Sequence, residues 1–400
     1  MIVRRFLAWI ETAPVPARAA ATGALARAYL FSPMAEQERA EAEAALTFLL
    51  DDEAPDVRRA LAEAFAHAEA APRHLLMALA ADQSDIAAIV LRGSSLITDA
   101  ELIDRAATGD ALVQAAVAQR PELSPPVAAA LAEVGELEAL LALAGNPGAA
   151  LPGFSMARMV ERHGDDARLR DALLGRSDLP IAVRQSLMAA AATAAAAGPD
   201  GAAPRAEVAR EATERATLAL APGCNPDALA ELVSHLKTSG QLTPMLLLRA
   251  LITGELNLTL AALGALAGMP PRRAAALAAE PHGGGFAALY RKAGLPPALF
   301  VPFRAALETA LAIIGREGIG PGPYLARRIV TAAIAACAEA GHDGDSRLVL
   351  TLRRFEMEAA REEARIAARD MVAQRPAMLA LAAVQQALLP DLRADEAEAA

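Results

Sequence analysis

The sequence predicts an all-α protein, in which an α-solenoid of helix pairs is followed by a less regular helical domain. The first observation is an apolar pattern that returns with the period of one short repeat. Its residues lie ten, six and five positions before equivalent loops, which places them on one stripe of each helix. The three rows are Leu61, Ile86, Val113, Ala139 and Leu169; Phe65, Val90, Val117, Leu143 and Leu173; and Ala66, Leu91, Ala118, Ala144 and Leu174. Only neighbouring repeats can cover such a stripe.

The loops between these helices are the second observation. LRGSSLIT, AQRPELSP, AGNPGAALP and LGRSDLP combine Gly, Pro, Ser or Asn with the start of a new helix, a composition that ends one helix and begins the next. Thr98 with Glu101 predicts a capping box, and Ser124 before Pro125 predicts an N-cap followed by proline at the first helical position. Short connections of this kind place consecutive helices side by side.

Composition narrows the class of protein. The 400 residues are 54% hydrophobic, which is ample for a helical core. The net charge of −10 and the 3% of aromatic residues argue against general nucleic-acid binding, because that binding needs a basic surface and stacking side chains. Cys224 and Cys337 are far apart in the sequence, which fits a reducing compartment without a disulfide framework.

No membrane segment is predicted, so we expect a cytoplasmic protein. Glu11 and Pro14 cut the first apolar run short of a signal-peptide core. The most apolar window, Leu256 to Met269, is too short to span a bilayer and contains Asn257 and Thr259.

In chain order, residues 1–54 are predicted to form N-terminal capping helices and residues 55–188 the HEAT-like repeats. An Ala/Gly/Pro-rich linker follows at 189–204, where GPDGAAP breaks the helical pattern. Residues 205–344 predict the C-terminal helical domain, and 345–390 a long charged helix with a terminal helix. The last ten residues, 391–400, predict a disordered acidic tail. The helix at 345–374 either closes the domain or serves as a docking or homodimer surface.

Several segments resemble known repeat families. Asp56 to Leu61 (DVRRAL) resembles the Asp-x-Arg helix of HEAT repeats, and Asp110 to Pro125 is similar to the leucine-rich repeat variant. The order of LITDAELI, AAVAQRPELS, LALAGNPGAAL, GQLTPMLLLRAL and LYRKAGLPPALF resembles a bacterial domain-of-unknown-function family with HEAT-like repeats, down to about Glu308. The resemblance implies an all-helical fold and brings no activity or catalytic residues.

The chemical motifs do not predict an enzyme. His282 to Phe286 (HGGGF) matches the oxyanion loop of some lipases, but that chemistry also needs a G-x-S-x-G nucleophile elbow on a strand, which the sequence lacks. The six histidines are scattered without the spacing of metal ligands. We therefore predict no catalytic residue, no metal site and no cofactor.

Surface chemistry is the remaining source of function. Arg92, Arg120 and Arg176 fall in corresponding loops and would line up along one ridge of a stack. They either tie off the carbonyl groups at helix ends or form a ladder for an acidic partner. A second set of predicted partner contacts is Tyr290, Arg291 and Lys292.

The function predicted from these features is a non-enzymatic protein–protein interaction scaffold or adaptor, whose partner is another protein. The alternative is a small-molecule or nucleotide sensor with a pocket in the C-terminal helical domain.

Overall fold

The structure, a computed structural model, describes residues 2–196, 206–317, 322–342, 344 and 346–371. Within these ranges every regular element is helical, and the strand-like pairing is limited to an isolated parallel bridge between Leu123 and Ala149. This confirms the predicted all-α class. The chain divides into two compact units, residues 1–213 and 214–400.

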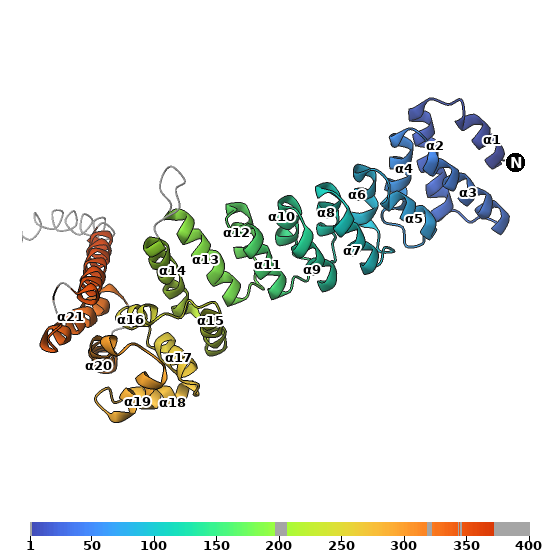
Figure 1. Ribbon diagram of the computed structural model, residues 1–400. Coiled ribbons are helices and arrows are strands. Elements are labelled where there is room, and N and C mark those ends of the chain that lie inside the picture. The colour runs from blue at the N-terminus through green and yellow to red at the C-terminus, as the bar shows by residue number, and fades with distance from the viewer. Residues whose placement is uncertain (1, 197–205, 318–321, 343, 345, 372–400) are drawn as a thin grey trace, which may run out of the picture. The chain divides into compact units, whose positions relative to one another are not determined.

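The first unit is a two-layered stack of helix pairs (Figure 1). One layer consists of α4 (Pro55–Phe65), α6 (Ser84–Gly93), α8 (Ala111–Ala118), α10 (Leu137–Gly145) and α12 (Ala167–Leu174). The other layer consists of α5 (Arg73–Ala80), α7 (Asp99–Thr108), α9 (Pro125–Val134), α11 (Gly153–His163) and α13 (Ile181–Ala195). From α4 to α12 each helix of the first layer packs on the next, and α7, α9, α11 and α13 do the same in the second. The stack begins with α1 (Ile2–Ile10), α2 (Val15–Phe31) and α3 (Glu36–Phe48).

The predicted apolar rows form the interior of this stack. Fourteen of the fifteen row residues are buried, and Leu174 is partly buried. One continuous hydrophobic core runs from Ala26 in α2 to Leu187 in α13. Because no single pair of helices could cover its own stripe, the repeats depend on one another for stability.

The capping residues predicted at two helix starts are confirmed in part. The carboxylate of Glu101 accepts hydrogen bonds from the backbone N–H (2.9 Å) and hydroxyl (2.8 Å) of Thr98, as half of the predicted capping box. Ser124 occupies the N-cap position as predicted, but its buried hydroxyl oxygen has no hydrogen-bond partner among the described residues and makes no capping hydrogen bond. The proline at the first helical position, Pro125, is present as predicted.

The first part of the predicted linker is helical. Residues 189–195 belong to α13, because a run of alanines extends a helix readily. Residues 197–204 lie outside the described ranges. The division between the two units falls between Thr213 and Glu214, within α14 (Ala206–Leu220).

The second unit packs around α16 (Pro244–Ile252), in which every residue from Leu246 to Ile252 is buried. This helix contacts α17 (Leu256–Ala267), α20 (Phe300–Glu317) and α21 (Pro323–Glu339). The smaller helices are α15 (Pro226–Thr238), α18 (Pro271–Ala278) and α19 (Gly284–Lys292).

The expectation about membrane segments needs a correction. Residues Pro297–Gly315 form a helix long and apolar enough to cross a membrane by length and composition alone, whereas we expected no such window. The apolar stripe of α20, which includes Phe303, Leu307 and Ile313, is buried, and the helix packs along α21. In all, 33% of this apolar window is buried.

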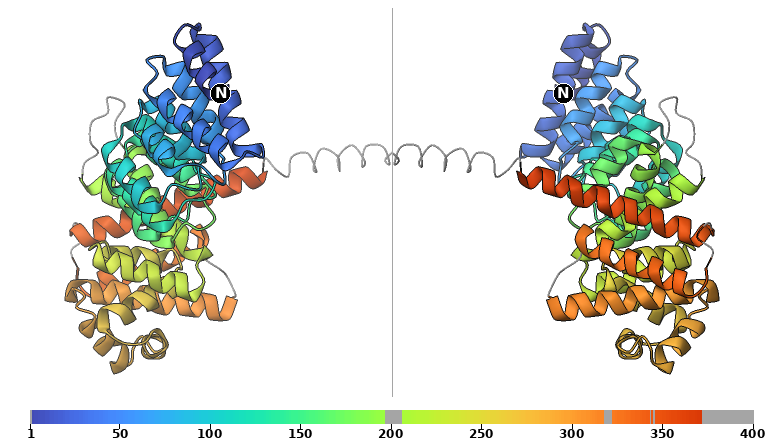
Figure 2. Two further views of the ribbon diagram at one scale, coloured as in Figure 1. Left: turned by 90° about the vertical axis from the view of Figure 1, so that its right-hand side faces the viewer. Right: turned by 90° about the vertical axis from the view of Figure 1, so that its left-hand side faces the viewer.

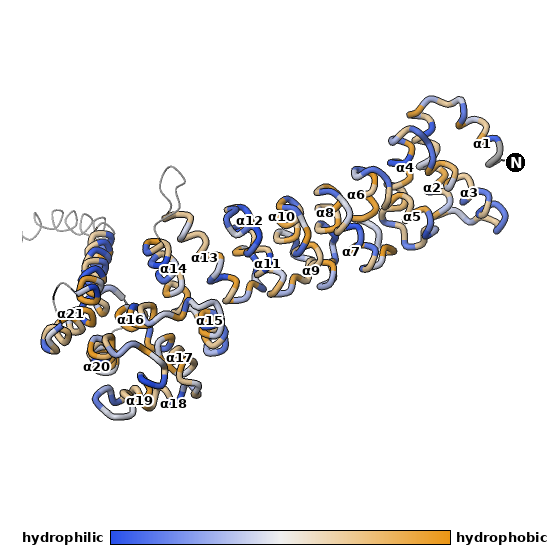
Figure 3. Tube along the Cα trace, viewed as in Figure 1, coloured by the Kyte–Doolittle hydropathy of each residue, from blue (hydrophilic) through white to orange (hydrophobic). Residues whose placement is uncertain are grey.

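The predicted long charged helix is described over residues 347–371. It lies beside α21 (Figure 2), to which it is joined by Arg327 to Glu363 (3.1 Å) and Thr331 to Glu356 (3.3 Å). Its sequence alternates hydrophilic and apolar residues (Figure 3). The apolar face is buried up to Ala359, and beyond it Ile366 is 39% exposed. The helix therefore closes the unit along part of its length, and its docking or homodimer role stays a prediction. The predicted terminal helix and acidic tail lie outside the described residues.

Candidate functional site

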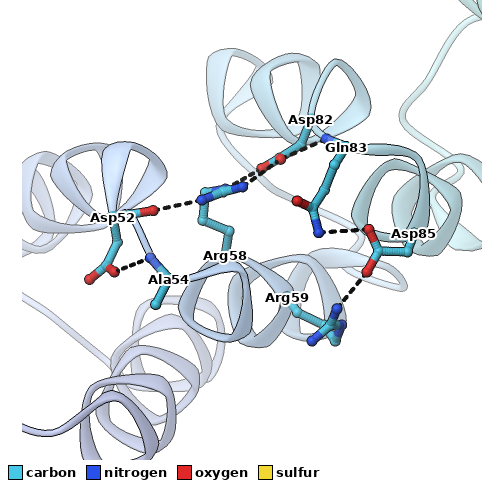
Figure 4. Close-up of polar contacts among 7 residues, drawn as sticks. All are labelled: Asp52, Ala54, Arg58, Arg59, Asp82, Gln83 and Asp85. Carbon is cyan, nitrogen blue, oxygen red and sulfur yellow. Dashed lines mark hydrogen bonds and ion pairs between the residues drawn. The ribbon is translucent and has the colours of Figure 1, made fainter.

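Charged side chains link successive repeats of the first unit near the start of the stack (Figure 4). The guanidinium of Arg58 in α4 donates to both carboxylate oxygens of Asp82 (2.7 and 3.0 Å) and to the carbonyl of Asp52 (2.7 Å). Asp52 accepts hydrogen bonds from Arg18 (2.8 and 3.0 Å) and from the N–H of Ala54 (2.9 Å). Burial acts to raise the pKa of Asp52, but these hydrogen bonds outweigh it and the pKa is lowered.

A second set of contacts joins the loops in the middle of the stack. The Arg120 guanidinium, only 9% exposed, donates to the carbonyl oxygens of Leu91 and Ser94 (2.8 Å to Ser94) at the end of α6. One repeat later, the amide of Asn146 donates to the carbonyls of Ala118 and Arg120, both at 2.7 Å. Carbonyl groups at a helix end have no partner inside the helix. These side chains therefore complete the helix ends and bind one repeat to the next.

Arg176 repeats the arrangement at the following loop. Its guanidinium donates to the carbonyls of Ala144 (3.3 Å), Asn146 (3.0 Å) and Ala149 (3.1 Å), and pairs with Asp178 at 2.8 Å. We call Arg120, Asn146 and Arg176 the carbonyl ladder. Its members hold the loops of the first unit in register, and their N–H groups donate to carbonyl groups within the protein.

The second unit contains a cavity of about 1150 Å³, somewhat larger than the usual range for ligand pockets. Its wall comes from α14, α16, α21 and the helix at 347–371. The apolar part of the wall consists of Leu218, Ala219, Pro222, Ile252, Ala326, Phe355, Ala359, Ala364 and Ala368. The cavity is thus open to a ligand with a substantial apolar body.

One buried cation lies in this wall. Arg249 projects from α16, which is buried from Leu246 to Ile252, and is itself buried. Its Nη1 lies 3.3 Å from the carboxylate of Glu214 in α14, and its Nη2 lies 2.9 Å from that of Glu358 in the helix at 347–371. The guanidinium also stacks over the ring of Phe355, 4.4 Å from its centroid. A buried charge needs such partners, because removal from water costs several kcal/mol.

Further charged groups surround the cavity. Arg215, Arg361 and Arg365 add basic groups to the wall, and Glu255 and Glu362 add acidic ones. Burial raises the pKa of the Glu255 carboxyl, because a desolvated carboxylate is less stable than its neutral form. The cavity therefore combines an apolar wall with ionisable groups of both signs.

The family comparison covers most of both units. A family model described as an uncharacterised protein conserved in bacteria, DUF2336, matches residues 86–343. The chain belongs to the DUF2336 family. The match confirms the expected bacterial domain-of-unknown-function family, although it ends later in the chain than the resemblance suggested. No curated protein and no solved structure matches the chain significantly.

The DUF2336 match contains three of the wall's charged residues, Arg215, Arg249 and Glu255, but ends before the helix that carries Phe355 and Glu358. Of the predicted partner contacts in the first unit, Arg120 and Arg176 belong to the carbonyl ladder. They bind the carbonyl groups at helix ends, which is the first of the two alternatives predicted for them. Their N–H donors are therefore not available to an acidic partner. Arg92 is exposed, with a single long contact of 3.5 Å to Gln119.

The structure buries one residue of the second predicted contact set and exposes the other two. Tyr290 is 1% exposed, its ring packs against Phe286, Phe300 and Phe303, and its hydroxyl donates to the carbonyl of Pro296 at 2.9 Å. Its prediction as a surface contact is wrong, because an aromatic ring among other rings belongs to the core. Arg291 and Lys292 are exposed as a contact patch requires.

Sequence reasoning missed the ion-paired group at the cavity. Glu214 and Glu358 lie 35 and 109 residues from Arg249, so no local pattern connects them. The signal that was present is an arginine inside the apolar run MLLLRALI, since a buried helix carries a charge only where partners meet it. In the described part of the chain, no three His, Cys, Asp or Glu side chains come together as metal ligands.

Proposed function

We propose that this DUF2336 protein is a non-enzymatic protein–protein interaction scaffold of the bacterial cytoplasm, built on HEAT-like repeats. The observation that carries the proposal is the carbonyl ladder. It ties consecutive repeats together through their loops, so that the stack presents its outer surface as one continuous unit. Solenoids of this kind bind other proteins along their extended faces.

Exposed ion pairs on the stack indicate part of the chemistry of the partner. They bridge neighbouring repeats, as in Arg158 with Glu133 (2.9 Å) and Arg168 with Glu138 (3.0 Å). Exposed pairs contribute little to stability, so their charges can exchange for those of a partner at small cost. The partner surface we expect therefore carries charges that can pair with these side chains.

Affinity capture from a native bacterial extract tests this scaffold function. The bait is the full-length protein, compared with the double variant Arg158→Glu/Arg168→Glu, and Arg272→Glu is the control, because Arg272 is an exposed residue of the second unit outside both predicted contact sets. We expect proteins that the wild type and the control retain and the double variant loses, while circular dichroism shows all three folded alike. If the double variant retains the same proteins, or if the wild type retains nothing above background, the scaffold proposal is wrong.

The cavity favours a second function, that of a small-molecule sensor in the second unit. Its apolar wall with a few charged groups has the character of a ligand site. A thermal-shift screen of metabolites would support this function through a compound that raises the melting temperature, because ligands of the folded state stabilise it. A screen in which no compound raises it would count against the sensor.

A further inference from the structure

The two carboxylates that pair with Arg249 differ in their surroundings. The side chain of Glu214 is 5% exposed, whereas that of Glu358 is 36% exposed. Breaking the pair with Glu214 would leave a buried carboxylate without its cation, which is strongly unfavourable. Glu358 can turn toward water instead. Of the two partners, Glu358 is the one that another anion can replace.

The cavity wall contains cations that an incoming anion can contact. Arg215, Arg249, Arg361 and Arg365 lie in the wall together with Glu255, Glu358 and Glu362. Glu214 also pairs with Arg249 at 3.3 Å, so the charges around the cavity balance while Glu358 holds its place. Once Glu358 turns away, an incoming anion restores that balance.

The apolar part of the wall sets the shape of the ligand. Phe355, Ile252 and Leu218 offer apolar surface in the same cavity as the Arg249 guanidinium. A small inorganic anion would leave this surface in contact with water, and an uncharged hydrocarbon would leave Arg249 with its present partners. A molecule with an acidic head and a long apolar body satisfies both parts.

We propose that the cavity binds an amphipathic carboxylic acid, whose carboxylate takes the place of Glu358 on Arg249 while its hydrocarbon body lies against Phe355 and the alanines of the wall. The proposal rests on the sensor function and names the ligand class of that site. The exchange leaves the charge balance at Arg249 unchanged, because one carboxylate leaves its Nη2 and another takes its place. The carboxylate of Glu358 moves into water.

This exchange gives the ligand a mechanical consequence. Glu358 belongs to the helix at 347–371, so its pair with Arg249 fastens that helix to the buried helix α16. Two polar contacts between this helix and α21, from Arg327 to Glu363 and from Thr331 to Glu356, lie on the exposed side. Contacts of that kind hold a helix weakly. Binding of the acid therefore loosens the helix at 347–371.

The experiment uses the full-length protein and two probes, the fluorescent fatty acid cis-parinaric acid and its methyl ester, each below its aggregation concentration. We expect the acid to bind about tenfold more tightly than the uncharged ester, the size of one charge-assisted contact. Glu358→Gln removes the competing carboxylate and should tighten acid binding by about a further five- to tenfold without affecting the ester. Glu363→Gln is the matched control: it lies on the same helix, is paired with Arg327, is absent from the cavity wall, and should change neither.

Hydrogen exchange supplies a second readout that does not depend on variants. The acid should accelerate amide exchange in residues 350–363 of the wild type, and the ester should not. If acid and ester bind equally and Glu358→Gln changes neither, the carboxylate exchange is wrong although the cavity binds ligands. If neither probe binds, the sensor function fails together with this inference.

Discussion

Replacing Arg120 by methionine tests the carbonyl ladder. Methionine keeps an unbranched apolar side chain in the same space but cannot donate to the carbonyls of Leu91 and Ser94. Each buried carbonyl left without a donor costs about 1–3 kcal/mol. Part of that loss returns, because burial disfavours the charged guanidinium and thereby lowers the pKa of Arg120. We expect the free energy of unfolding to fall by about 2–3 kcal/mol.

Urea unfolding of the full-length protein, followed by far-UV circular dichroism, measures this change. The matched control is Arg92→Met, since Arg92 occupies the corresponding position one loop earlier but is exposed and makes only a contact of 3.5 Å. The control should change the free energy of unfolding by less than about 0.5 kcal/mol. Equal losses for the two variants would refute the reasoning, because burial and carbonyl binding would then make no difference.

Three other predictions follow from particular contacts. Gly148→Ala should destabilise the first unit by about 1–3 kcal/mol, because a Cβ at this position would lie 1.8 Å from the carbonyl oxygen of Pro121. A Cβ at Gly145 would meet no neighbouring atom, so Gly145→Ala should stabilise α10 by about 0.5 kcal/mol. Thermal unfolding should therefore show a lower melting temperature for the first variant and a higher one for the second. A double-mutant cycle with Arg58→Met and Asp82→Asn should give a coupling free energy of about 1–2 kcal/mol. The same cycle on the exposed pair of Arg168 and Glu138 should give no measurable coupling. Equal coupling free energies for the two pairs would contradict the role of burial. Glu255→Gln should raise the melting temperature at neutral pH, because the raised pKa of Glu255 makes its buried carboxylate destabilising above the folded-state pKa. This advantage of the variant should disappear as the pH falls below the ordinary pKa of 4.5, where the carboxyl is protonated in both the folded and the unfolded state. An advantage that persists in acid would contradict the assignment.

The helical architecture could be predicted because its information is local. The buried rows through Leu61, Phe65 and Ala66 recur at fixed spacing, and covering them requires a stack. The roles of Arg120 and Arg176 could be narrowed to two alternatives from their loop positions. The choice between those alternatives depends on which carbonyls lie across the loop, and that is decided by tertiary packing.

The cavity could not be predicted in the same way. Its wall brings together residues from α14 to the helix at 347–371, and the ion-paired group depends on contacts between Arg249 and partners distant in the sequence. Tyr290 shows the converse error. A basic neighbourhood in the sequence, with Arg291 and Lys292 adjacent, suggested a surface, but helical geometry turns consecutive residues to different faces. Only packing against Phe286 and Phe303 reveals that the ring is core.

Hydrogen exchange at the loop amides tests most directly whether the repeats of the first unit act as one stack. The N–H of Leu123 donates to the carbonyl of Gly148 (3.2 Å), and the N–H of Ala150 donates to that of Leu123 (3.0 Å), across two successive loops. If the carbonyl ladder joins the repeats, these two amides should share one free energy of opening with the buried helices α8 and α10, and Asn146→Ala should lower all of them together. Rapid exchange at the two loop amides, or a loss confined to the mutated loop, would contradict a stack held together through its loops.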